Sequence, residues 1–74
     1  MTELLVQFRP DVPLARRQAL AQQLGCTIVE EIPPQGIMVV RAPADATLSA
    51  LLAQWHRHPE VAHVEPNAEV NPHG

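Results

Sequence analysis

The sequence predicts an α+β domain with the ferredoxin-like order of elements, β-α-β-β-α-β. Three observations support this prediction. Four short apolar stretches have the length and residue types of strands, two further stretches carry apolar side chains at helical spacing, and proline and glycine fall between them. Two split β-α-β units of this kind form a four-stranded antiparallel sheet with both helices on one face and with the first and third strands in the middle.

The first predicted strand covers residues 3–8, "ELLVQF". Successive side chains of a strand point to opposite faces, so one face carries Leu4, Val6 and Phe8. Leu5 and Gln7 therefore lie on the other face.

The first predicted helix covers about residues 13–24. Asp11 is placed to cap its N-terminus, and Gly25 is placed to end it, because glycine adopts the left-handed conformation that closes many helices. The apolar stripe consists of Leu14, Leu20, Ala21 and Leu24. Arg17 lies at the edge of this stripe, where its aliphatic stem can pack while its charge reaches water.

The second and third predicted strands cover residues 26–32, "CTIVEEI", and 36–42, "GIMVVRA", with the loop "PPQG" between them. Glu30 and Glu31 are neighbours in a strand and therefore point to opposite faces, which argues against a catalytic pair of carboxylates. Cys26 begins the second strand and is expected to be a small packed side chain.

The second predicted helix is marked by apolar residues at positions i, i+3, i+4 and i+7, namely Leu48, Leu51, Leu52 and Trp55. Asp45 is its expected N-cap, and Pro59 prevents the helix from continuing.

The fourth predicted strand covers residues 61–65, "VAHVE". Its side chains alternate between a face with Ala62 and Val64 and a face with His63 and Glu65. Pro66 ends the strand. The predicted domain therefore comprises residues 1–66, and residues 67–74, which have no packing pattern, are expected to form an extended C-terminal tail.

The face of the sheet that the helices leave uncovered should be polar, but the sequence makes it apolar. The third strand contains the run 37–40, "IMVV", and either register leaves two of these side chains on the uncovered face. Leu5 joins them, with Gln7, His63 and Glu65 around them. A patch of this kind marks an interface. Its partner is either a second copy of the chain, which would give a homodimer through the sheet, or a different protein.

Composition and charge argue against several other functions. The net charge is −3 and the aromatic residues are Phe8 and Trp55, so the chain has neither the basic patch nor the aromatic groups of a nucleic-acid surface. No signal peptide is visible, and the longest apolar run is too short for a membrane span. The single Cys26 excludes an internal disulfide, and His56 and His58 are two residues apart, which does not bring two metal ligands to one helix face. We therefore expect no metal, no cofactor and no catalytic residue.

Several stretches of the sequence resemble one known family. "LLVQFRPDV" is followed by a helix, "LG" precedes the second strand, "GIMVVRA" is the third strand, and "HPEVAHVEPN" contains the fourth. In this combination and order they resemble the propeptide-type inhibitor domain of subtilisin-like serine proteases. The resemblance covers residues 3–70, and its most specific part is the final stretch.

The resemblance implies a function. In that family the domain is an inhibitor and intramolecular chaperone of its protease; its sheet packs on two parallel helices of the protease domain. Leu5, Gln7 and His63 would then belong to the sheet interface. Glu65 matches the acidic position that caps a protease helix, and Asn67 stands where a second acidic residue often occurs and can act as a neutral cap.

The resemblance also assigns roles in the tail, which in that family lies in the substrate cleft of the protease. The corresponding residues here are Val70, Asn71, Pro72 and His73. His73 falls near the residue that precedes the cut, and Val70 then lies four residues before the cut, where such proteases favour an apolar side chain. Two departures are that histidine is an unusual residue before the cut and that Gly74 extends one residue past the aligned end.

Two functions from different classes stay open at this point. The first is inhibitor and chaperone of a subtilisin-like protease domain, secreted with it if the chain is cut from a precursor, and cytoplasmic if the chain stands alone. The second is a small ferredoxin-like module that self-associates through its open sheet face and has no protease partner. Neither of these functions is enzymatic.

Overall fold

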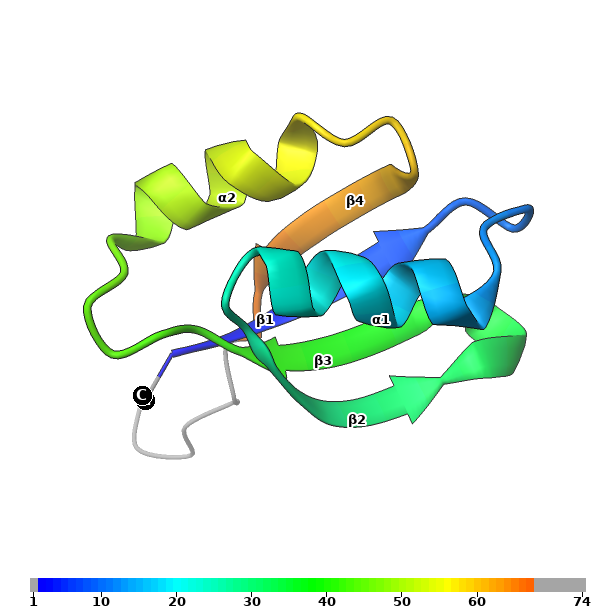
Figure 1. Ribbon diagram of the computed structural model, residues 1–74, viewed down its shortest axis with the longest axis horizontal. Coiled ribbons are helices and arrows are strands. Elements are labelled where there is room, and N and C mark those ends of the chain that lie inside the picture. The colour runs from blue at the N-terminus through cyan, green and yellow to red at the C-terminus, as the bar shows by residue number, and fades with distance from the viewer. Residues whose placement is uncertain (1, 68–74) are drawn as a thin grey trace.

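The computed structural model describes residues 2–67, and its elements follow the predicted order (Figure 1). The strands are β1 (Glu3–Phe8), β2 (Thr27–Ile32), β3 (Ile37–Arg41) and β4 (Val61–Pro66); the helices are α1 (Leu14–Gln23), α2 (Leu48–His56) and a short 3-10 helix, η1 (Pro33–Gln35). The strands form an antiparallel sheet in the order β2-β3-β1-β4, so β1 and β3 are central. Figure 1 shows α1 and α2 on the same side of this sheet. The predicted α+β ferredoxin-like fold is confirmed.

The core lies between the sheet and the two helices. Trp55 of α2 is completely buried and meets the ring of Phe8 edge to face, with the ring centroids 6.1 Å apart. Such a pair contributes about 0.5–1.5 kcal/mol beyond its area burial. The other buried apolar residues are Leu4, Val6, Val12, Leu20, Ala21, Cys26, Met38, Val40, Leu51, Val61 and Val64. The predicted core face of the first strand is therefore confirmed.

The first residue of each predicted helical stripe is not in the core. Leu14 is 41% exposed and Leu48 is 39% exposed, so the prediction was wrong for both. Each stands at the first position of its helix, and the buried face begins three residues later, at Arg17 of α1 and at Leu51 of α2. The first turn of each helix thus extends beyond the part that covers the sheet.

Neither predicted aspartate cap is present. The N-cap positions are Pro13 in α1 and Thr47 in α2, and neither residue makes a side-chain capping bond. Pro13 has an extended backbone with ψ 151°, so the helix begins after it and Asp11 lies too far upstream. Before α2, the N–H of Ala46 donates to the carbonyl of Pro43 at 3.1 Å, and this turn delays the helix past Asp45.

The C-terminus of α1 forms as the glycine signal predicted. Gly25 has φ +72°, a conformation that other residues rarely adopt. Its N–H donates to the carbonyl of Gln22 at 3.0 Å, and the N–H of Cys26 donates to that of Ala21 at 2.9 Å. These two bonds are a Schellman motif, which satisfies carbonyls at the helix end and directs the chain into β2.

Arg17 is buried, with 8% of its surface exposed, although the sequence placed it at the edge of the helical stripe. Its Nε donates to the carbonyl of Val12 at 2.9 Å, and its guanidinium lies over the ring of Phe8, 5.7 Å from the centroid. The segment that leads into α1 therefore holds the Arg17 side chain against the fold instead of leaving it extended into solvent.

The simple alternation predicted for β4 is interrupted. His63 lies opposite Gln7, but Val61 lies opposite Phe8, so the pairing of β1 with β4 shifts by one residue. This bulge leaves Ala62 exposed and places Val61 in the core, which corrects the expectation that Ala62 and Val64 share the core face. The pairing of β2 with β3 contains a similar shift, at Val29, which is 43% exposed.

Candidate functional site: the open face of the sheet

The register of the sheet decides which side chains point away from the helices. Residues directly opposite each other in neighbouring antiparallel strands share a face. Val6 is buried beneath the helices, so its neighbour Leu5 faces the other way. Leu5 lies opposite Val39 of β3 and opposite Glu65 of β4. These three side chains are therefore neighbours in one row across the open face.

The next row of the open face contains Gln7, which lies opposite Ile37 of β3 and His63 of β4. Ile37 in turn lies opposite Ile32 of β2. The register that the sequence left open is thus settled: the third strand presents Ile37 and Val39 on the open face.

The centre of the open face is apolar. It consists of Leu5, Ile32, Ile37 and Val39, a group that we call the open-face patch. Val39 is only 8% exposed, because Leu5 and Glu30 flank it from the neighbouring strands, whereas the other three members are half-buried. The uncovered face is therefore apolar where an uncovered sheet face would ordinarily be polar.

Polar and charged side chains surround the patch. Gln7, His63 and Glu65 lie on the side of β4, as the sequence predicted, and Glu30 lies on the side of β2, opposite Val39. All four are exposed. An apolar centre with a polar rim is the usual composition of a surface that binds another protein.

Glu65 presents an available acceptor at the outer edge of this face. Its side chain is 54% exposed, and its ion-pair partner among the described residues is His63, with 3.8 Å between Oε1 and Nε2. This separation is too long for a hydrogen bond. No described residue therefore occupies the lone pairs of the Glu65 carboxylate, which can accept N–H groups from a bound partner.

Asn67 is fixed at the start of the predicted tail. Its backbone N–H donates to the carbonyl of Glu3 at 2.8 Å, which extends the contact of β4 with β1 one residue past the strand. Its Nδ2 donates to Oε1 of Glu3 at 3.5 Å. No described residue donates to the side-chain oxygen of Asn67, which can therefore accept a hydrogen bond, as the predicted capping role requires.

Sequence reasoning missed a charged pair beside these residues. Arg41 of β3 lies directly opposite Glu3 of β1, and Nη2 of Arg41 is 3.4 Å from Oε2 of Glu3. Glu3 therefore contacts both Arg41 and Asn67 and ties the end of β4 to the middle of the sheet. Opposite charges on the two central strands are the signal that could have revealed this pair, but only with the register known.

The Cys26 thiol is not a candidate nucleophile. The residue is buried, its Sγ lies 3.8 Å from the carbonyl oxygen of Leu24, and burial raises the pKa of the thiol above its ordinary value of 9.0. The neighbouring Trp55 side chain opposes this rise in pKa without cancelling it. A thiol that stays protonated at neutral pH is a poor nucleophile.

The predicted cleft residues Val70, Asn71, Pro72 and His73 lie outside the described residues. Within residues 2–67 there is no group of three or more His, Cys, Asp or Glu side chains that could hold a metal ion. The helices of that same part are all too short or too polar to cross a membrane.

The fold and the open-face patch fit a small domain of the propeptide type. A comparison with protein families agrees: the model of the fervidolysin N-terminal prodomain matches residues 2–67. The chain belongs to this family, which is a family of subtilisin-type prodomains rather than of catalytic domains. No curated protein and no solved structure matches the chain significantly.

Proposed function

We propose that this domain inhibits a subtilisin-like protease and assists the folding of its catalytic domain. The observation that carries the proposal is the open-face patch with Glu65 at its edge, in a chain that belongs to a prodomain family. The prodomain family implies association with a protease domain, and in this proposal the open-face patch is the surface that meets it.

The apolar part of this surface would supply most of the docking energy. A standard interface buries about 800 Å² on each partner. Burial of apolar area is favourable by roughly 25 cal/mol per Å², although only a fraction of this appears as affinity. A pair of helices on the protease domain fits such a surface, because helices pack side by side on the flat face of a sheet.

The charge of the rim fits the same partner. Glu65 and Glu30 are exposed carboxylates on opposite sides of the patch. A helix N-terminus carries unpaired N–H groups and about half a positive charge, so it favours a carboxylate. We place Glu65 at such a terminus, with the side-chain oxygen of Asn67 as a second, neutral acceptor.

The segment that follows Asn67 would occupy the substrate cleft. An extended chain can pair with the edge of a cleft as an added strand, in which backbone bonds provide affinity and side-chain pockets provide specificity. The backbone N–H of Asn67 is hydrogen-bonded to the carbonyl of Glu3. The tail would therefore leave the sheet from a fixed point beside Glu65. Val70, Asn71, Pro72 and His73 are the proposed cleft residues, and the protease would cut the tail slowly.

Self-association through the sheet is the second candidate function, because the same apolar patch could pair with itself. Glu65 and Glu30 argue against it, since a two-fold contact places like charges of the rim near each other and excess like charge opposes association. Sedimentation of the chain alone at micromolar concentration separates the two cases: a dimer would favour self-association.

The test of the main proposal is an inhibition assay. Hydrolysis of a small peptide substrate by several subtilisins is measured with increasing amounts of the chain. We expect competitive inhibition that declines over time as the chain is digested. No inhibition of any subtilisin at micromolar concentration would contradict the proposal. In this proposal the chain is exported together with its protease as part of a precursor.

A further inference from the structure

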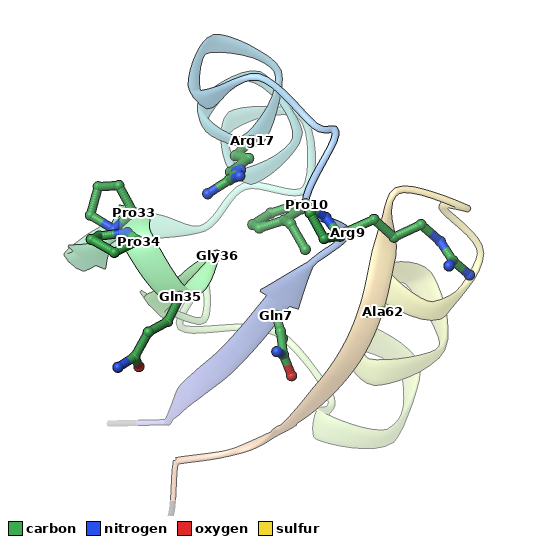
Figure 2. Close-up of a pocket in the computed structure, with 10 residues that line it drawn as sticks. Gln7, Arg9, Pro10, Arg17, Pro33, Pro34, Gln35, Gly36 and Ala62 are labelled. Carbon is green, nitrogen blue, oxygen red and sulfur yellow. The ribbon is translucent and has the colours of Figure 1, made fainter.

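A second concave site lies at one end of the sheet, outside the open-face patch. It is a pocket of about 270 Å³ (Figure 2). Its walls come from the end of β1, from η1 and Gly36, from Arg17 of α1 and from Ala62 of β4. Since a water molecule occupies about 30 Å³ in the liquid, the pocket has room for a small ligand.

The chemistry of the pocket is determined by Arg17, the buried charged residue of the described part of the chain. The bond from its Nε to the carbonyl of Val12 and its position over the Phe8 ring fix the guanidinium in place. These contacts use one of the five N–H donors of the group. Gly36 borders the guanidinium group. A Cβ atom built on this glycine would lie 4.0 Å from Nη1 of Arg17. Figure 2 shows the head group directed toward the η1 prolines.

Among residues 2–67, no carboxylate forms an ion pair with this cation. The ion pairs among residues 2–67 involve Arg16, Arg41 and His63 but not Arg17. The described residues that line the pocket include no acidic residue. The remaining N–H donors of this largely buried side chain face the pocket without a competing protein acceptor, so an anion that enters the pocket gains a charge-assisted interaction.

The second arginine of the pocket does not compete for this role. Arg9 lines the pocket, but its Nε donates to the carbonyl of Pro59 at 2.7 Å. In Figure 2 its guanidinium points away from Arg17. Arg17 is therefore the donor that an anion in the pocket would meet, and Arg9 offers a matched control.

We propose that this pocket binds one small oxyanion, a carboxylate or a phosphate, through the guanidinium of Arg17. A guanidinium presents paired N–H groups that match two oxygens of such an anion. Gln7 belongs both to the pocket wall and to the rim of the open-face patch, so the pocket adjoins the surface of the proposed docking. The oxyanion is thus either an acidic side chain of a docked protein or a free anion. The inference does not depend on the proposed protease inhibition.

The test is a titration of the chain alone, followed by ¹H–¹⁵N NMR. Inorganic phosphate is the first probe, and sodium chloride at equal ionic strength is the reference. We expect saturable shifts of the Gly36 amide and of the Arg17 Nε–H in phosphate and no saturable shifts in chloride. Shifts that do not saturate, or that chloride reproduces, would overturn the proposal even without any variant.

Variants and a second probe identify the donor and the source of the anion. Arg17→Gln should abolish the saturable shifts, and Arg9→Gln should preserve them. If Arg17→Gln does not fold, Arg17→Lys retains the charge, and it should weaken phosphate binding at least tenfold because the paired donors are lost. Persistence of wild-type binding in either Arg17 variant would overturn the assignment. N-acetylglutamate amide is the second probe: tighter binding than phosphate supports an acidic side chain as the ligand, and weaker binding supports a free anion.

Discussion

Glu65 is the residue whose proposed role depends most on position. Its carboxylate stands at the end of an edge strand, half exposed and without a close partner among the described residues. A carboxylate at a helix N-terminus contributes about 0.3–1 kcal/mol, and more when partly buried. Glu65→Ala should therefore weaken inhibition about two- to fivefold, measured as the inhibition constant.

Glu30→Ala is the matched control for that measurement. Glu30 is an exposed carboxylate on the same face, but it lies on β2 at the far side of the patch. If only the net charge mattered, the two substitutions would have equal effects. An equal loss in both variants would contradict a specific capping role for Glu65.

Burial of Cys26 makes the stability of the fold depend on pH. The direction of the pKa shift determines the sign of this dependence. Burial raises the pKa of its thiol above 9.0, so the folded chain holds this proton at a pH where the unfolded chain releases it. The stabilisation from the protonated thiol is therefore complete below pH 9.0 and is lost as the pH rises through the folded-state pKa.

The free energy of unfolding should accordingly decrease above pH 9.0, and in Cys26→Ala it should decrease less. Urea unfolding at a series of pH values measures this difference. The native thiol should also react slowly with a thiol reagent at pH 8 and rapidly in denaturant. Equal reaction rates in the two conditions would show that Cys26 is accessible in the folded chain.

At the scale of the elements, α2 offers a direct test of which leucines hold the helix on the sheet. Leu51 is 4% exposed, whereas Leu48 is 39% exposed on the same helix. Leu51→Ala should lower the free energy of unfolding by about 2–5 kcal/mol, and Leu48→Ala by about 0.5 kcal/mol or less. Urea unfolding measures both, and similar losses would contradict the observed start of the buried face.

Two adjacent leucines of β1 test the two faces of the sheet in the same way. Leu4 is completely buried beneath the helices, and Leu5 belongs to the open-face patch. Leu4→Gln should unfold the chain, because it buries a polar group without a partner. Leu5→Gln should keep the circular dichroism spectrum and weaken inhibition about fivefold or more, since it removes part of the roughly 1.5–3 kcal/mol that a buried leucine contributes. Unfolding of Leu5→Gln would contradict the assignment of the faces.

The elements also show what a single sequence can and cannot predict. The end of α1 was predictable because only a residue that tolerates positive φ suits the position of Gly25. The starts of the helices were not, because the proline before α1 and the turn before α2 replaced the aspartate caps. The bulges in β2 and β4 depend on pairing with distant strands, so alternation along one strand could not reveal them.

The candidate site was predictable to a similar degree. Leu5, Gln7, His63 and Glu65 share a face, as strict alternation indicated, because no bulge lies between His63 and Glu65. The contribution of β3 became definite only with the register, which identified Ile37 and Val39. The pocket at Arg17 was not predictable, because it depends on how α1, η1 and β1 meet.

At the scale of the whole molecule, the sheet separates stability from binding. One face packs against the helices and forms the core, and the other carries the open-face patch. For 74 residues the expected free energy of unfolding is only about 4–11 kcal/mol. A substitution on the open face can therefore change binding without unfolding the chain, whereas a single large core deletion can remove most of the stability.

The tail and the sheet would contact different parts of the protease, so inhibition and folding assistance can be tested separately. Deletion of residues 69–74 removes the proposed cleft segment but leaves Glu65, Asn67 and the sheet intact. Inhibition should fall steeply, because the cleft is no longer filled, while assistance to a refolding protease domain should survive in part, because it depends on the sheet. Glu65→Ala should show the opposite balance, with a modest loss of inhibition and a clearer loss of assistance.

The measurement requires a related subtilisin-like catalytic domain that is denatured and returned to buffer with each variant. Recovered activity, read after the variant has been digested, reports folding assistance, and the inhibition constant on the native enzyme reports cleft binding. Circular dichroism should be unchanged in both variants, since neither change touches the core. If the chain without residues 69–74 inhibits as well as the full chain, the tail does not occupy the cleft. The inhibitory contact would then lie on the sheet, and Leu5→Gln rather than the deletion would abolish inhibition.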